Sequence, residues 1–280
     1  MSGRLSFQGK RPVHCRCRCP LAPRGGIRRA TRTKAEFEGM LVEQLGFHHE
    51  GVWWALRRFA PLWHAPCGAT WSFGRHPSFV AARAPTLPDA ERQAEGVQHL
   101  VRRYLGAFGP ASAQDVSQFT LLRRSVVRSA LRALDGELRK LEGPDGSELF
   151  DLAGAYLPDE GTAAPPRLMA MWDSTLLAYR DRSRVVPEEY RRMVIRQNGD
   201  VLPTLLVDGY VAGVWRPVGG GIEATAFHHL PDEAWAALAA EASMLVRFLA
   251  EREPEVYRRY AHWWSKLPQA EVRVLSGPTD

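Results

Sequence analysis

The chain has 280 residues, of which 45% are hydrophobic, and it carries a formal net charge of +6. This length suits two or three compact domains, each with its own core. No stretch approaches the roughly 18 to 20 uncharged apolar residues that a membrane-spanning helix needs, so the sequence excludes helical membrane proteins and predicts a soluble protein.

Most of the positive charge lies at one end of the chain. Residues 1–34 hold eight Arg, two Lys and no acidic residue, which leaves 27 basic residues against 31 acidic ones in the rest. The basic pI does not by itself indicate a nucleic-acid partner. Because residues 1–32 show no hydrophobic period and no apolar core of a secretory signal, we predict a disordered basic leader there.

The cysteines predict neither a disulfide framework nor a metal site. Cys15, Cys17 and Cys19 alternate with arginines, and Cys67 stands alone. A structural zinc site usually draws on two ligand pairs, so this triplet, even with the neighbouring His14, supplies half a site at best. We expect no bound metal.

Residues 33–86 predict a partial winged-helix domain. Thr33-x-x-Glu36 is a capping box that begins a helix ending at Gly46, and a second helix follows over 50–60. Strand-type residues then bracket the turn at 66–68; they are Leu62, Trp63, Thr70, Trp71 and Phe73. Helix, helix, hairpin is the order of the later part of a winged helix.

The same order recurs more fully over residues 87–153, which we interpret as a structural repeat. The predicted elements are helices over 89–108, 112–119 and 122–134 and strands over 137–142 and 148–152. Gly109-Pro110 ends the first helix, Ser112-x-x-Asp115 caps the second, and a Gly-Pro-Asp-Gly turn separates the strands. By order and length this is a complete winged helix.

The third helix of this unit carries a stripe of arginines. Arg124, Arg128 and Arg132 follow one another at helical spacing beside an apolar face. On the helix that should be the recognition helix, such a stripe suits contact with DNA phosphates or guanine edges. The alternative is a solvated basic face without a ligand.

The segment 154–166 is rich in Gly, Pro and small residues, which predicts a linker. The sequence over 167–265 predicts a β-rich domain with a helix that begins at Pro231. Its clearest feature is a hairpin in which Asp208-Gly209 suits a two-residue type I′ turn between two apolar runs. Residues 266–280 are expected to be a tail.

A second basic segment lies in the β-rich domain. If Arg180, Arg182 and Arg184 alternate along an extended chain, all three point to one side and suit a phosphate backbone. The alternative is that they pair with Asp181, Glu188 and Glu189.

Three segments together resemble a known family. They are Gly-Ala-Phe-Gly-Pro-Ala-Ser at 106–112, Tyr-Arg-Asp-Arg-Ser-Arg-Val-Val at 179–186 and Leu-Pro-Thr-Leu-Leu-Val-Asp-Gly-Tyr-Val-Ala-Gly-Val-Trp-Arg at 202–216. In this order and at these separations, they resemble the bacterial winged-helix DNA-binding proteins of the AlkZ-like DNA glycosylase family, over residues 33–265.

The resemblance implies an α+β protein with tandem winged helices, followed by a small barrel-like β domain with a packing helix, around a concave DNA-binding surface. It implies excision of alkylated or crosslinked purines from damaged double-stranded DNA by cleavage of the N-glycosidic bond, without a metal or organic cofactor. It also implies a monomer in the cytoplasm, associated with the nucleoid.

One part of the family's pattern is missing. Its catalytic Gln-x-Gln motif and a later Arg-Gly-Thr-x-His-like segment belong to a first winged helix, and neither occurs before Thr33. Gln93-Ala94-Glu95 is superficially similar, but it falls on a linking helix, and we interpret it as polar helix surface. We therefore expect a chain without this motif, as a truncated or misassigned gene start would leave it.

No catalytic residue is assigned from the sequence. Ser174 has no base beside it, and no serine-hydrolase elbow, zinc-protease motif, phosphate loop or dinucleotide fingerprint occurs. Asp173, next to Trp172, is either a general base with a raised pKa or, more simply, a cap. His228 and His229 suit surface positions equally well.

The leading prediction is a DNA-binding protein that resembles the glycosylases but lacks their Gln-x-Gln motif. The alternative is a winged-helix transcriptional regulator or a non-catalytic interaction protein. Whether the chain is an enzyme stays open at this point.

Overall fold

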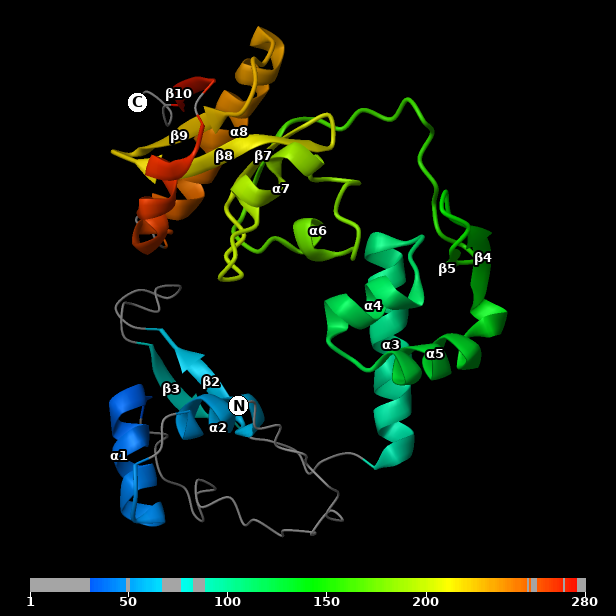
Figure 1. The fold of residues 1–280 in the computed structure, drawn as a ribbon, viewed down its shortest axis with the longest axis vertical. Coiled ribbons are helices and arrows are strands. Elements are labelled where there is room, and N and C mark those ends of the chain that lie inside the picture. Colours follow the sequence, from blue (N-terminus) through cyan, green and yellow to red (C-terminus); the bar gives the residue numbers. More distant parts are fainter. Residues whose placement is uncertain are drawn as a thin grey trace, which may run out of the picture. The chain divides into compact units, whose positions relative to one another are not determined.

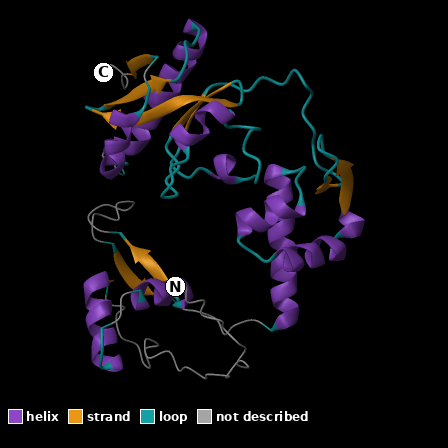
Figure 2. Cartoon of the chain, in the orientation of Figure 1, coloured by secondary structure: helices purple, strands orange, loops and turns teal. Residues whose placement is uncertain are grey.

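The computed structural model describes residues 31–48, 51–66, 77–82, 89–250, 252, 256–268 and 270–275. The chain divides into two compact units, Met1–Pro85 and Thr86–Asp280. Both combine helices with antiparallel sheets, so the α+β class is confirmed (Figures 1 and 2). Within the described residues, none of the helices has the length and apolarity to span a bilayer.

The described residues of the first unit form two helices and a small sheet. Its elements are β1 (Arg32–Thr33), α1 (Lys34–Leu45), α2 (Val52–Phe59), β2 (Leu62–Ala65) and β3 (Ser78–Ala81), and the strand order is β1-β3-β2. Phe37, Trp53 and Phe79 form an aromatic core, with ring centroids 4.9 Å apart for Phe37 and Trp53 and 5.1 Å apart for Trp53 and Phe79. Three aromatic rings thus join both helices to the sheet.

The start of this unit agrees with its sequence signals. The Thr33 backbone N–H donates to the Glu36 carboxylate at 2.6 Å, the Thr33 hydroxyl accepts from the Glu36 N–H, and Gly46 ends α1 at a φ of 76°. The partner of β2 is β3, at Ser78–Ala81. The predicted strand residues Thr70, Trp71 and Phe73 lie outside the described residues, as do residues 1–30 and all four cysteines.

The second unit begins with three helices and a hairpin, which we call the helix–hairpin module. It consists of α3 (Ala90–Phe108), α4 (Ala113–Thr120), α5 (Arg124–Ala133), a 3-10 turn η1 (Asp135–Glu137), β4 (Leu138–Glu142) and β5 (Glu148–Leu152). Its core includes Val101, Val116, Val127, Leu131 and Phe150. Between α3 and α4 the chain forms an antiparallel bridge from Ala111 to Phe150, which ties the helices to the hairpin.

Gly109 sits where α3 meets the hairpin. A Cβ atom at this position would lie 2.6 Å from the Leu105 carbonyl oxygen and would also collide with the Asp151 carboxylate. Asp151 is buried and pairs with Arg139 at 3.0 Å. The absent side chain of Gly109 therefore lets the end of the helix approach β5 closely.

A five-stranded antiparallel sheet follows. Its strands are β6 (Arg167–Met169), β7 (Thr204–Val207), β8 (Tyr210–Val218), β9 (Gly221–Ala226) and β10 (Glu271–Leu275), in the order β10-β9-β8-β7-β6. Asp208 and Gly209 have φ values of 51° and 77°, as the predicted type I′ turn requires. β10 lies in the predicted tail, and the ladder is open between β10 and β6, so barrel closure stays a prediction.

The two faces of this sheet pack against different helices. Along β8, Ala212 and Trp215 face one core with Trp235 and Leu238 of α8 (Asp232–Ala250), whereas Val211 and Val214 face the other. That second core is covered by α6 (Ser174–Leu177), α7 (Glu188–Val194) and the 3-10 helix η2 (Arg258–Lys266). The sheet is apolar on both faces, because both are buried.

The segment Ala178–Arg184 connects the sheet to the helix–hairpin module, and we call it the docking segment. The buried Tyr104 hydroxyl donates to the Ala178 carbonyl oxygen at 2.6 Å, and the Tyr179 hydroxyl donates to the Phe108 carbonyl oxygen at 2.8 Å. The Arg180 N–H donates to the Asp115 carboxylate at 2.8 Å. Partners more than sixty residues apart in sequence thus hold this segment against α3 and α4.

We expect Gly109→Ala to lower the free energy of unfolding by about 1–3 kcal/mol, because the added methyl group must displace Asp151 or the end of α3. The matched control is Gly96→Ala in the same helix, where a Cβ meets nothing within 4 Å. It should stabilise by about 0.5–1 kcal/mol through helix propensity. Urea denaturation measures both, and equal effects of the two substitutions would contradict the close approach.

We expect Tyr104→Phe to destabilise the chain by about 1–3 kcal/mol, because the buried Ala178 carbonyl loses its donor. Burial also raises the pKa of Tyr104. The neutral phenol therefore stabilises the fold below the unfolded pKa of about 10, and this contribution is lost as the pH rises above it.

Urea denaturation at about pH 8 and pH 11 checks this expectation. The unfolding free energies of the wild type and the Phe variant should converge at the higher pH. Tyr210→Phe, which changes an exposed residue, serves as the control. A constant difference between wild type and Tyr104→Phe at both pH values would disprove the role of the buried phenol.

Candidate functional site

The arginine stripe of α5 lies on its exposed face. Val127, Ala130 and Leu131 are buried on the opposite side, so α5 is anchored by apolar residues, whereas Arg124, Arg128 and Arg132 face the surface. None of the three arginines forms an ion pair with a described carboxylate. The predicted geometry of the stripe is confirmed, while its ligand is a separate question.

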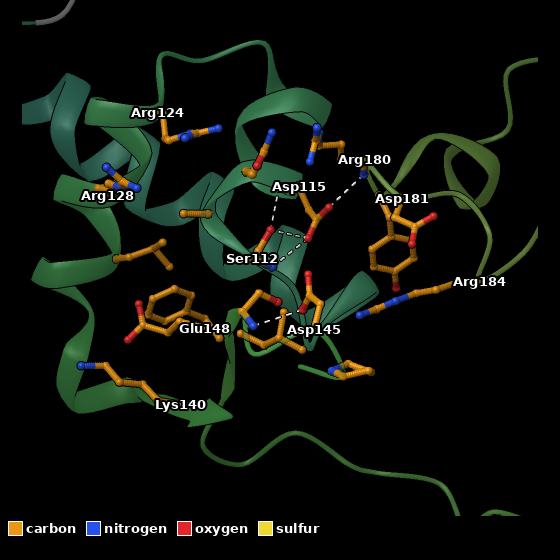
Figure 3. A pocket seen from close by; sticks show the side chains of 18 of the residues that line it. Ser112, Asp115, Arg124, Arg128, Lys140, Asp145, Glu148, Arg180, Asp181 and Arg184 are labelled. Carbon is orange, nitrogen blue, oxygen red and sulfur yellow. Dashed lines mark hydrogen bonds between the residues drawn. The ribbon is translucent and has the colours of Figure 1, made fainter. Parts of the chain in front are cut away.

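A cavity of about 750 Å³ lies beside this stripe (Figure 3). Figure 3 shows Arg124 and Arg128 on the α5 side and Arg180 and Arg184 on the opposite side, with Ser112 and Asp115 between them. The charged residues of its lining are Asp115, Arg124, Arg128, Arg132, Asp135, Lys140, Asp145, Glu148, Arg180, Asp181 and Arg184. Five of the six arginines that the sequence singled out therefore surround one cavity.

Several carboxylates of the cavity are bound to internal donors. The Asp145 carboxylate accepts from the Ser147 N–H at 3.1 Å and the Asp181 carboxylate from the Ser183 N–H at 3.0 Å, and these serines lower the pKa of both acids. Asp135 pairs with Lys140 at 2.7 Å, which raises the pKa of the lysine through their hydrogen bond.

The charges of the cavity nearly balance, with six cations against five carboxylates in the lining. Four of these carboxylates, on Asp115, Asp135, Asp145 and Asp181, already accept from donors within the chain. An incoming anion would therefore meet mainly guanidinium donors from α5 and from the docking segment. Guanidinium groups bind phosphate oxygens through paired N–H donors, so the cavity suits a phosphate better than a cation.

The predicted extended conformation of residues 180–184 is wrong. The Val185 and Val186 N–H groups both donate to the Arg182 carbonyl oxygen, so the chain turns there, because these bonds satisfy backbone groups locally. Arg182 does not line the cavity; burial, followed by the charge of Arg191, lowers its pKa. The predicted pairing with Asp181, Glu188 and Glu189 is also absent, and Glu188 pairs instead with Arg191 at 3.9 Å.

Arg184 is held in place by its surroundings. Its guanidinium donates to the Pro110 carbonyl oxygen at 3.2 Å and lies 4.6 Å from the centre of the Tyr179 ring. Burial raises the pKa of the Tyr179 phenol. The aromatic contact and the hydrogen bond orient this arginine at the rim of the cavity.

The other candidates from the sequence have structural partners. The Asp173 carboxylate accepts from the Thr175 N–H at 2.8 Å and caps α6, which supports its simpler interpretation. His228 contacts the Tyr190 hydroxyl at 2.9 Å, and His229 lies 3.4 Å from Glu271. Gln93 and Glu95 lie on the exposed first turns of α3. The described residues contain no group of three metal-ligating side chains.

Sequence reasoning missed two parts of the site. Lys140 and Glu148 reach the cavity because β4 and β5 pair beside α5, which no local pattern reveals. Asp115 was recognised only as a cap, yet its carboxylate also accepts from Arg180 at 2.8 Å. The contact with Arg180 had one local signal in the sequence: Asp115 is an aspartate at a capping-box position that more often carries a glutamate.

Comparisons with known proteins identify the family of the chain. Residues 24–248 match the model of the family described as DNA glycosylase AlkZ-like. The chain is 30% identical over 146 residues to an interstrand DNA cross-link repair glycosylase of Streptomyces sahachiroi, a match that covers 48% of this chain and 37% of that protein.

A solved structure shares the fold. The Streptomyces sahachiroi DNA glycosylase AlkZ aligns with a TM-score of 0.56 at 23% identity, over 78% of this chain and 62% of the other. The present chain thus spans less than two thirds of the length of either relative. Because the family model covers most of its length, the chain belongs to the AlkZ-like DNA glycosylase family.

Proposed function

We propose that the chain binds damaged double-stranded DNA through the cavity and the arginine stripe of α5. The observation that carries this proposal is the convergence of five arginines, three from α5 and two from the docking segment, on one concave surface. Each guanidinium that meets a phosphate releases condensed counterions, which supplies affinity without sequence preference. Membership of a DNA glycosylase family supports DNA as the ligand.

We infer that the helix–hairpin module is a winged helix with α5 as its recognition helix. The order of three helices and a hairpin, with the Ala111 bridge as a short extra strand, supports this assignment. In such a module the exposed face of the third helix lies along a DNA groove. The exposed face of α5 is the one that carries Arg124, Arg128 and Arg132.

Binding of DNA and excision of a base depend on different groups of the protein. The described residues bring no base and nucleophile together at the cavity. Four of its five acids are bound to serines, to a lysine or to the backbone, and the sequence lacks the Gln-x-Gln motif before Thr33. We propose a DNA-binding monomer that does not itself cleave the N-glycosidic bond. A winged-helix regulator that binds undamaged DNA is the second candidate, because the same stripe serves it.

Replacing the stripe should weaken binding and its salt dependence together. For Arg124→Ala/Arg128→Ala/Arg132→Ala, the slope of log K against log salt should fall by about 0.9 for each lost phosphate contact, that is by up to about 3. Fluorescence anisotropy with a labelled duplex at several salt concentrations gives both quantities.

The matched control removes three arginines from exposed positions outside the cavity, as Arg92→Ala/Arg103→Ala/Arg247→Ala. It changes the net charge equally but should leave most of the slope in place. Equal losses in the two triple variants would mean that only overall charge attracts the DNA, and would contradict a defined interface.

We expect no abasic sites when the purified chain is incubated with a methylated-purine duplex, because the described residues that line the cavity supply no positioned catalytic pair. Alkaline cleavage of the labelled strand followed by gel electrophoresis detects abasic sites directly. Robust excision would show that the chain has catalytic residues of its own. Tighter binding to the methylated than to the unmodified duplex would favour repair over the regulator.

A further inference from the structure

We infer that Asp115 is a positioning residue whose buried carboxylate sets Arg180 and Arg184 against the arginine stripe of α5. The inference rests on the proposed DNA binding, which it deepens by assigning the group that shapes the interface. The Asp115 side chain is shared between two segments that are distant in sequence, because it accepts from both Ser112 and Arg180.

The two oxygens of Asp115 have different partners. Oδ2 accepts from the Ser112 backbone N–H at 2.8 Å and from the Ser112 hydroxyl at 2.6 Å, which completes the capping box of α4. Oδ1 accepts from the Arg180 N–H at 2.8 Å, 65 residues away in sequence. A capping box needs only the first set of bonds, so the bond to Arg180 is an additional role.

Burial makes this second bond selective. Asp115 is one of four polar or charged residues that are buried among those described, with a relative solvent exposure of 8%. A buried carboxylate is costly unless donors surround it, so a conformation in which the Arg180 N–H moves away leaves Oδ1 without its donor. The carboxylate thereby favours the one backbone conformation that brings Arg180 to the cavity.

The neighbouring contacts transmit this constraint to Arg184. Tyr179 is bonded to the Phe108 carbonyl oxygen and lies beneath the Arg184 guanidinium, which in turn donates to the Pro110 carbonyl oxygen. Phe108 and Pro110 lie just before α4, whose first turn contains Asp115. The three bonds therefore fix both ends of the Arg180–Arg184 turn on one short stretch of the module.

The consequence for DNA binding is a fixed spacing between two groups of cations. α5 is rigidly packed through Val127 and Leu131, so the position of the docking segment decides whether Arg180 and Arg184 reach the same duplex as the stripe. A mobile segment would lose entropy when it is held on the duplex, so its two arginines would make fewer phosphate contacts in the complex. Asp115 thus pre-organises two of the five arginines.

The first test needs no DNA. Amide hydrogen exchange of Arg180 reports the bond to Oδ1 directly, and Asp115→Asn should lower its protection by at least about tenfold, because an amide cannot accept from both sides. Asp89→Asn is the control, since Asp89 caps α3 by accepting from Arg92 at 2.9 Å and does not line the cavity. Unchanged protection of Arg180 in Asp115→Asn would overturn the inference.

The second test uses the salt dependence of duplex binding. Asp115→Asn should reduce the slope of log K against log salt by about as much as Arg180→Ala/Arg184→Ala does, that is by up to about 1.8. In the Arg180→Ala/Arg184→Ala background, Asp115→Asn should have no further effect, because the residues that it positions are gone. If Asp115→Asn lowers the slope further in the Arg180→Ala/Arg184→Ala background, Asp115 does not act through these two arginines. If it lowers thermal stability and leaves the slope unchanged, Asp115 is only a helix cap.

A second variant covers the case in which Asp115→Asn does not fold. Asp115→Glu keeps the capping box, which accepts glutamate at this position, but its longer side chain displaces the Arg180 backbone. It should keep more of the wild-type thermal stability than the Asn variant, because the cap is retained, and it should match the Asn variant in the salt slope; a wild-type slope would overturn the inference. If Asp115→Asn loses the protection of Arg180 but the wild type binds no duplex, the proposed function alone is rejected, since Asp115 would still hold the segment.

Discussion

The attachment of the docking segment to α3 and α4 is the constraint on which the larger unit depends. Tyr104, Tyr179, Asp115 and Arg180 make hydrogen bonds that join residues from the helix–hairpin module to the segment between β6 and α7. Two of these donors are tyrosine hydroxyls that reach main-chain carbonyls, and the third acceptor is a buried carboxylate. Because each would be costly to leave unpaired inside the protein, the segment has one favoured position.

This constraint links stability to the candidate interface. The same bonds that hold the segment place Arg180 and Arg184 across the cavity from α5, so the cationic surface is a product of packing. On α5 the link is simpler: Val127, Ala130 and Leu131 bury one face, and the arginines occupy the other. This cationic surface combines one packed helix with one loop held by hydrogen bonds, and the fold fixes the positions of both without a ligand.

Local structure was predictable where the signal lay within a few residues. The capping boxes at Thr33 and Ser112, the end of α1 at Gly46 and the Asp208-Gly209 turn follow from short-range hydrogen bonding and from the tolerance of positive φ. The turn at Arg182 was missed, since alternating charges fit a strand as well as a turn. β10 was missed because its pairing with β9 joins residues about fifty positions apart, and no nearby hairpin signal marks it.

The sequence by itself determined the order of the elements in the helix–hairpin module, the arginine stripe of α5 and, through three short segments, the family. Periodicity, caps and turns are local properties of the chain. The tertiary structure alone decided that Arg180 and Arg184 share a cavity with α5 whereas Arg182 does not. It also gave Asp115 its second partner. The physical reason is that burial and hydrogen bonds between distant residues arise only when the chain is packed, so one carboxylate can be a helix cap by sequence and an anchor for a distant segment by fold.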